Sequence, residues 1–375
     1  MQRFLLSILL LTVGSCAAVQ PSEPLANQTR EAPRFRVSSY ATDTFGTRFI
    51  NATDSGVHSY EGSSEENNGI IYACRAGHID LGHLRKAADW TAFLTERTYL
   101  QLLAGQTDFT FKFYEPSIYH VQVSYPESWR DLPVAEKERI ANEVAISAGQ
   151  YFSHVGLTWH EILTWYDYRI TGIYPHYSSA FSWEDTYSNA LGVYLAGLAL
   201  EDSEHDFDTA MTGLLEREVA SLGPQPASVS EQASVSMRGH WYTEKIWFMV
   251  DMRARNLDIG LGDGLVSPWL IPTVEECSSS TPKDYPVPGE NALSQQGFGI
   301  KLEIDPQVPQ NDELFQAAFR EGEPDNARLE PQVHFPAIMA QIRRDAERRY
   351  GAELLEAPSR PAMPARSTRP TRPTR

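Results

Sequence analysis

Two adjacent side chains in the middle of the chain, His160 and Glu161, are of the types that bind a metal ion and activate water. A histidine ring nitrogen is a common zinc ligand, and a glutamate beside it can take a proton from metal-bound water. Farther along the chain, Asp185, Ser188 and Asn189 have the i, i+3 and i+4 spacing of one helix face. Together these residues predict a polar pocket that serves a chemical function.

The two groups resemble the active-site motifs of thermolysin-like zinc peptidases. In the His-Glu-x-x-His arrangement, two histidines one helical turn apart bind zinc, and the glutamate polarises the bound water. The resemblance implies that His160 and Asp185 are zinc ligands and that Glu161 is the general base. It also implies supporting roles for Ser188 and Asn189, with Asn189 orienting His160.

One zinc ligand of the peptidase pattern is replaced. Thr164 stands where the second histidine is expected, and threonine is a poor zinc ligand. A third ligand must come from elsewhere, and His83 is the best candidate because Asp80 and His83 lie three residues apart at an expected helix start. We therefore expect His83 as the third ligand, supported by Asp80. His240 and Glu244, four residues apart, are a weaker choice.

Two functional classes follow from these residues. The first is a metal-dependent hydrolase, with zinc as the expected ion and an amide or ester as the substrate. The second is a catalytically inactive scaffold that binds a cell-wall polymer or an envelope protein. Convergence of His83, His160, Glu161 and Asp185 in one cleft favours the hydrolase, whereas their separate burial with individual partners favours the scaffold.

A second resemblance covers residues 65–330. The stretches 72–80 (YACRAGHID), 158–165 (TWHEILTW) and 181–189 (FSWEDTYSN) are similar to a family of bacterial envelope lipoproteins without an assigned activity. The resemblance implies an envelope location and one undivided domain, and it carries no substrate or mechanism.

The first 16 residues have the features of an export signal that ends in a lipid attachment site. Residues 4–13 are mostly apolar, which is too short for a membrane span, and small residues precede Cys16. We expect Cys16 to carry the lipid that anchors the protein to the outer membrane, facing the periplasm. The alternative is an ordinary signal peptide cleaved at another position.

The remaining cysteines, Cys74 and Cys277, are expected to form a disulfide because an exported protein folds in an oxidising compartment. The alternative is a thiol hydrolase with Cys74 as the nucleophile and His78 or His83 as its base. A disulfide at Cys74 would exclude that alternative.

Composition divides the chain into four parts. Residues 1–16 are the signal, and residues 17–68 are expected to form a flexible tether because they are rich in polar residues and proline. Residues 69–356 form the globular domain, and residues 357–375 are a basic tail of proline, arginine and threonine that could contact anionic lipid or cell-wall polymer. The net charge of −17 makes nucleic acid an unsuitable partner.

The pattern of apolar residues predicts a single helix-rich α+β domain with a small β-sheet. The resemblance to zinc peptidases implies a zincin-like form for it. Strand character is expected at residues 107–125, 242–259 and 299–304, with turns at 260–272. Ser182 is the expected N-cap of the helix that carries Asp185. Helices are expected at residues 80–103, 136–166 (one or two), 182–200, 206–222, 312–320 and 336–355.

Overall fold

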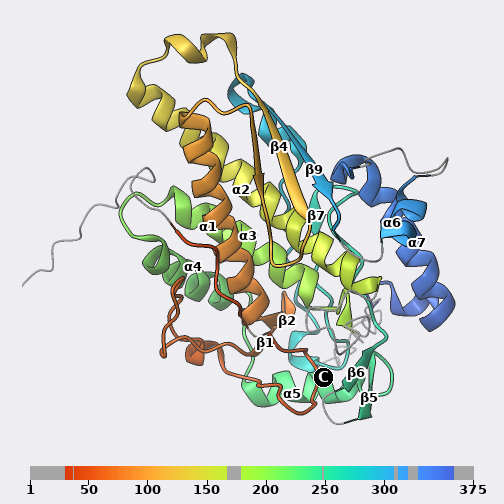
Figure 1. The fold of residues 1–375 in the computed structure, drawn as a ribbon. Coiled ribbons are helices and arrows are strands. Elements are labelled where there is room, and N and C mark those ends of the chain that lie inside the picture. Colours follow the sequence, from red (N-terminus) through yellow and green to blue (C-terminus); the bar gives the residue numbers. More distant parts are fainter. Residues whose placement is uncertain are drawn as a thin grey trace, which may run out of the picture.

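The computed structural model describes residues 30–36, 38–166, 179–246, 249–307, 311–319 and 328–358. Within these residues the chain forms an α+β domain, as predicted, in which three long helices pack together and small antiparallel sheets lie around them (Figure 1). In this described part, no helix is long and apolar enough to cross a membrane.

The first long helix begins directly at the end of a hairpin. Strand β1 (Ile70–Ala73) pairs antiparallel with β2 (Gly77–Asp80), and α1 (Leu81–Leu103) follows without a loop. Asp80 ends the strand and caps the helix, because its Oδ1 accepts a hydrogen bond of 2.6 Å from the Gly82 N–H. Asp80 and His83 are therefore held in place by the strand-to-helix junction.

Glycines allow α1 to approach the other two long helices closely. Helix α2 (Val134–Trp165) is one continuous helix, and α3 is Asp185–Glu201. A Cβ on Gly192 of α3 would lie 2.1 Å from the carbonyl oxygen of Leu84 on α1, and one on Gly149 of α2 would lie 2.1 Å from Thr95 Oγ1. The sequence thus brings three helix backbones together where a larger residue would separate them.

A three-stranded antiparallel sheet covers one side of α2. Its order is β3 (Asp108–Phe111), β4 (Ile118–Ser124) and β9 (Gly299–Asp305), with β4 in the centre. In β4, Tyr119, Val121 and Val123 alternate with more exposed residues and point into the core. Phe111 of β3 stacks on Tyr119 and lies 5.4 Å, between ring centroids, from Phe152 of α2.

The remaining elements surround this core. Besides the three long helices there are α4 (Phe207–Ser221), α5 (Ala227–Met237), α6 (Asn311–Ala318) and α7 (Pro331–Tyr350). The shorter strands form the pairs β5 (Tyr242–Ile246) with β6 (Met249–Met252), and β7 (Leu265–Val266) with β8 (Tyr285–Pro286). Short 3-10 helices lie at Ala52–Asp54, Glu127–Asp131, Glu275–Cys277, Glu290–Gly297 and Ala352–Leu354.

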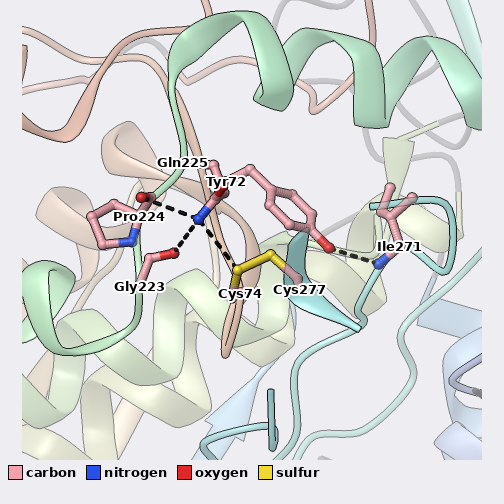
Figure 2. Close-up of a disulfide and its surroundings, with 7 residues drawn as sticks. All are labelled: Tyr72, Cys74, Gly223, Pro224, Gln225, Ile271 and Cys277. Carbon is pink, nitrogen blue, oxygen red and sulfur yellow. Dashed lines mark hydrogen bonds between the residues drawn. A yellow bond between two sulfur atoms is a disulfide. The ribbon is translucent and has the colours of Figure 1, made fainter. Parts of the chain in front are cut away.

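The predicted disulfide between Cys74 and Cys277 is present. It joins the turn after β1 to the loop around Glu275–Cys277, and Figure 2 shows how its surroundings are tied together. Gln225 donates from Nε2 to Cys74 Sγ and to the Gly223 carbonyl, and the Tyr72 hydroxyl accepts from the Ile271 N–H at 3.0 Å. Tyr72, Ile271 and the two cysteines belong to a second apolar cluster that also contains Trp183, Trp241 and Trp269.

The expected tether is wrong for residues 30–36 and 38–68, which pack against the domain. Arg36 is buried and bonds Asp89 of α1 at 2.7 Å, and Ile50 and Tyr60 join the apolar core. The polar composition gave a wrong prediction because many of these side chains form buried ion pairs instead of facing water. Cys16 and most of the basic tail lie outside the described residues.

Most predicted elements are confirmed, with corrections at their boundaries. Helix α3 has Glu184 at its N-cap position, so Ser182 lies ahead of the helix and does not cap it. Pro336 lies inside α7, which begins at Pro331. Helix α5 lies in a proline- and serine-rich stretch where no helix was expected, with Pro226 at its N-cap position. The zincin-like form stays a prediction.

Candidate functional site

A pocket of about 350 Å³ lies between the three long helices and the segment 33–40. Each helix contributes a residue with chemical function: His83 comes from α1, Glu161 from α2 and Asp185 from α3. His160 also lines the pocket, so the four residues whose convergence the sequence links to a hydrolase share one cavity. This convergence favours an active site over four separate structural roles.

Asp80, His83 and Asp185 form a buried cluster whose ligand atoms lie within 4.8 Å of one another. Asp80 Oδ2 lies 2.8 Å, and Asp185 Oδ1 3.0 Å, from the same atom, Nδ1 of His83. Apart from this charge contact, Asp185 Oδ1 is buried without a hydrogen-bond partner in the described structure. One imidazole nitrogen and two carboxylate oxygens are donor types that zinc and similar divalent ions accept. The cluster therefore fits a divalent transition-metal ion.

The charges around His83 determine how strongly its ring holds a proton when no metal ion is bound. Burial lowers the pKa of His83, but the negative charges of Asp185 and Asp80 outweigh this effect and raise the pKa to about 10. In the absence of a metal ion, a proton on Nδ1 lies between the two carboxylates. Metal binding would displace that proton, because a ligating histidine is neutral. On the other side of the ring, Nε2 lies 3.3 Å from Ser38 Oγ.

Glu161 faces the same pocket and is held by a strained turn. Its Oε2 accepts a hydrogen bond of 2.8 Å from the N–H of Phe181, whose φ of 56° is unusual for a residue with a side chain. The Phe181 carbonyl in turn accepts from the Asn256 N–H at 3.0 Å. Burial, and then the charge of Asp185, raise the pKa of Glu161 to about 7. A carboxyl group with such a pKa can take up and release a proton near neutral pH.

His160 lies outside the metal-ligand cluster, which corrects the predicted ligand set. Its ring packs edge-on against Tyr114 with 4.6 Å between centroids. Successive helical residues point about 100° apart, so Glu161 and His160 cannot both face the cluster. The structure instead places Asp80, which was expected only as a supporting residue, in the cluster that could hold a metal ion. Thr164 lines the pocket, and its buried hydroxyl has no hydrogen-bond partner among the described residues.

The two predicted supporting residues of α3 behave differently. Ser188 Oγ accepts a hydrogen bond of 3.0 Å from the Asp80 N–H and donates one of 2.7 Å to the Glu184 carbonyl, so it joins α3 to the start of α1. Asn189 Oδ1 is buried and accepts no hydrogen bond within the described part of the chain. The expected bond that would orient His160 through Asn189 Oδ1 is therefore wrong.

Three further pocket or near-pocket residues were not predicted from the sequence. Lys86 lies one helical turn after His83 on α1, a spacing that could have revealed it. Tyr40 comes from the segment expected to be a tether, and burial raises its pKa. Glu184 accepts a hydrogen bond from the Ala41 N–H at 2.7 Å, and burial raises its pKa well above the ordinary value.

A helix-rich α+β domain with a buried pocket of carboxyl and imidazole groups is the class of protein that the fold and site define. The chain belongs to the family described as "Protein of unknown function (DUF4056)", whose model matches residues 29–249. All residues that line the pocket fall within this match, whereas β9, α6, α7 and Cys277 lie beyond it. No curated protein and no solved structure matches the chain.

The disulfide rules out the thiol chemistry that the sequence left open. Cys74 is bonded to Cys277, so it has no thiolate to act as a nucleophile. His78, one of its two candidate bases, instead lies with Nε2 2.9 Å from the Ser230 carbonyl. His83, the other, belongs to the metal-ligand cluster. The thiol hydrolase alternative is therefore wrong.

Proposed function

We propose that this protein is a metal-dependent hydrolase in which Asp80, His83 and Asp185 hold a divalent cation and Glu161 is the general base. The observation that carries the proposal is the convergence of an imidazole and two aspartates in one buried cluster beside a buried glutamate. Zinc is the expected ion because it commonly binds three protein ligands in catalytic sites and leaves one position open.

Each residue has a separate task in this mechanism. The cation would lower the pKa of a bound water molecule and polarise the carbonyl group of an amide or ester. Glu161 would act as the proton acceptor through its carboxyl group, and the Phe181 N–H keeps this group in position. Ser188 fixes the junction of β2 and α1, so that Asp80 and His83 meet Asp185 of α3.

Paired variants separate metal binding from catalysis. Asp185→Asn removes a ligand charge and should lower metal occupancy and hydrolysis together. Glu161→Gln should retain the metal but lower hydrolysis at least about 100-fold, because it removes only the general base. Glu201→Gln, at the exposed far end of α3, is the matched control and should change neither property.

Metal content and the hydrolysis of a panel of amide and ester substrates are the two measurements. Equal losses of folding stability in Asp185→Asn and Glu161→Gln, with no metal in the wild-type protein, would contradict the proposal.

One observation favours the second class, a binding scaffold. His83 placed between two carboxylates makes a self-sufficient ion cluster without any metal. In that case the cluster joins α1 to α3, and the pocket binds a cell-wall polymer or an envelope protein without cleaving it. A wild-type protein that binds such a partner but holds no metal would support the scaffold.

We further propose that the protein is exported and lipid-anchored at Cys16, facing the periplasm from the outer membrane. The apolar segment 4–13 followed by small residues and a cysteine supports this location. The disulfide agrees with an oxidising compartment. The Cys16→Ser variant should leave the membrane fraction, and its retention there would contradict lipid anchoring.

A further inference from the structure

Lys86 places a cation inside the pocket without an acidic partner in contact. It lies three residues after His83 on α1, and its side chain lines the same cavity. Within the described structure, no carboxylate lies within ion-pair distance of Lys86 Nζ and no hydrogen bond uses its donors. Its contact there is the Tyr114 ring, whose centroid lies 5.7 Å from Nζ. Three N–H donors are therefore available in the pocket.

The Lys86 side chain is half-buried in the wall of the pocket, and its ammonium group has no bonded partner among the described residues. Burial lowers the pKa of Lys86, while more distant charges on Glu161, Asp185, Asp80 and Glu115 act in the opposite direction. None of these acids uses the donors of the ammonium group. An oxygen anion from outside the protein would complete the site.

The charges in the pocket also favour an anion at Lys86 once a divalent cation is bound. The ion would neutralise Asp80 and Asp185 and leave His83 uncharged. Lys86 would then be a positive side chain in the pocket without a bonded partner. The pocket would accept a negative group on the substrate at Lys86, next to the carbonyl group that the cation would polarise for attack by water, with Glu161 as the proton acceptor.

We propose that Lys86 binds a carboxylate of the substrate, so that the enzyme cleaves an amide or ester bond about one residue away from a free carboxylate. The C-terminal bond of a peptide has this arrangement. Side chains three apart on a helix have Cβ atoms about 5–6 Å apart, which is comparable with the span of one or two extended residues of about 3.5 Å each. This inference rests on the proposed function, because the cleaved bond is placed by His83 and Glu161.

The test compares two probes that differ only in charge, N-acetyl-alanyl-alanine and its C-terminal amide. Both are titrated by calorimetry into the full-length, detergent-solubilised Glu161→Gln protein, which prevents turnover. The acid should bind at least about tenfold more tightly than the amide, as expected for a charge-assisted hydrogen bond. Equal affinities, or no binding of either probe, would overturn the proposal without the need for a lysine variant.

Variants of Lys86 in the same background identify the group responsible. Lys86→Met should abolish the preference for the acid, whereas Lys86→Arg should keep most of it because the charge remains. Lys137→Met, at a half-buried position near the start of α2 and outside the pocket, is the matched control and should retain the full preference. A preference that survives Lys86→Met in folded protein would overturn the assignment.

Metal content measured on the same samples separates the two proposals. A metal-free protein that still prefers the acid through Lys86 would support the carboxylate site and contradict the metal-dependent hydrolase. A metal-loaded protein that binds acid and amide equally would contradict the carboxylate site alone.

Discussion

Two buried histidines near the start of α1 show how strongly a residue's chemistry depends on its partners. His78 and His83 are five positions apart, and burial lowers the pKa of both. His78 is bonded to uncharged groups, the Ser230 carbonyl and the Trp183 ring N–H, and its pKa falls to about 4. His83 has Asp185 and Asp80 beside it, and its pKa rises to about 10. The sequence contains both histidines but does not reveal which one meets carboxylates.

The buried ion pairs of the segment around Glu66 predict an acid-sensitive fold. Burial alone would raise the pKa of Glu66, but Arg36, Arg85 and Arg34 hold it below the ordinary value of 4.5. The pairs therefore contribute stability above about pH 4.5, and that contribution is lost as the pH falls through the lower folded-state pKa. Glu66→Gln should cost about 2 kcal/mol at pH 7, between the values of exposed and fully buried pairs, and clearly less at pH 3.

Urea unfolding at both pH values measures this difference. Glu136→Gln is the matched control because Glu136 pairs with Arg139 at the surface, and it should leave stability unchanged. A Glu66→Gln cost that is the same at pH 7 and pH 3 would show that its ion pairs are not the cause.

At the scale of elements, helix and strand positions were largely predictable, but contacts between them were not. Apolar spacing located α1, α2 and α4, and alternation located β4 and β9. Helical spacing also placed Ser188 on the face of Asp185. It could not show that His160 points to Tyr114 or that Asp80 completes the ligand cluster, because these depend on how helices rotate against one another. Packing of residues 30–68 was hidden by their polar composition.

The contact between α1 and α3 should tolerate no side chain at Gly192. A Cβ there would lie 2.1 Å from the Leu84 carbonyl, so Gly192→Ala must push the two helices apart. We expect a loss of about 1–3 kcal/mol in stability and weaker metal binding, because His83 and Asp185 lie on these two helices. Chemical unfolding and metal titration measure the two effects.

Gly213→Ala on α4 is the matched control for this prediction. Its added Cβ would meet only the flexible end of Arg217, at 3.1 Å. The higher helix propensity of alanine should then stabilise the protein by about 0.5–1 kcal/mol. A stabilising effect at Gly192 as well would contradict the close helix contact.

At the scale of the molecule, one disulfide encloses the three helix residues of the candidate site. Cys74 and Cys277 are separated by 203 positions, and His83, Glu161 and Asp185 all lie between them. A cross-link that closes so long a loop restricts the unfolded chain strongly. Reduction should therefore lower the free energy of unfolding by about 4 kcal/mol.

Thermal unfolding with and without a reductant measures this contribution. The Cys74→Ala/Cys277→Ala double variant should be about as stable as the reduced wild-type protein, and the reductant should not change its stability. A wild-type protein that is equally stable when reduced would show that packing alone holds the two segments together.

The metal content of the wild-type protein decides whether the pocket holds a metal ion. Mass spectrometry of the purified full-length chain, before and after reconstitution with zinc, should find about one equivalent of a divalent transition metal. The Asp185→Asn variant should hold much less, because the cluster loses one of its two carboxylate ligands. A wild-type protein that stays free of stoichiometric metal after reconstitution would contradict the account and leave the binding scaffold as the better one.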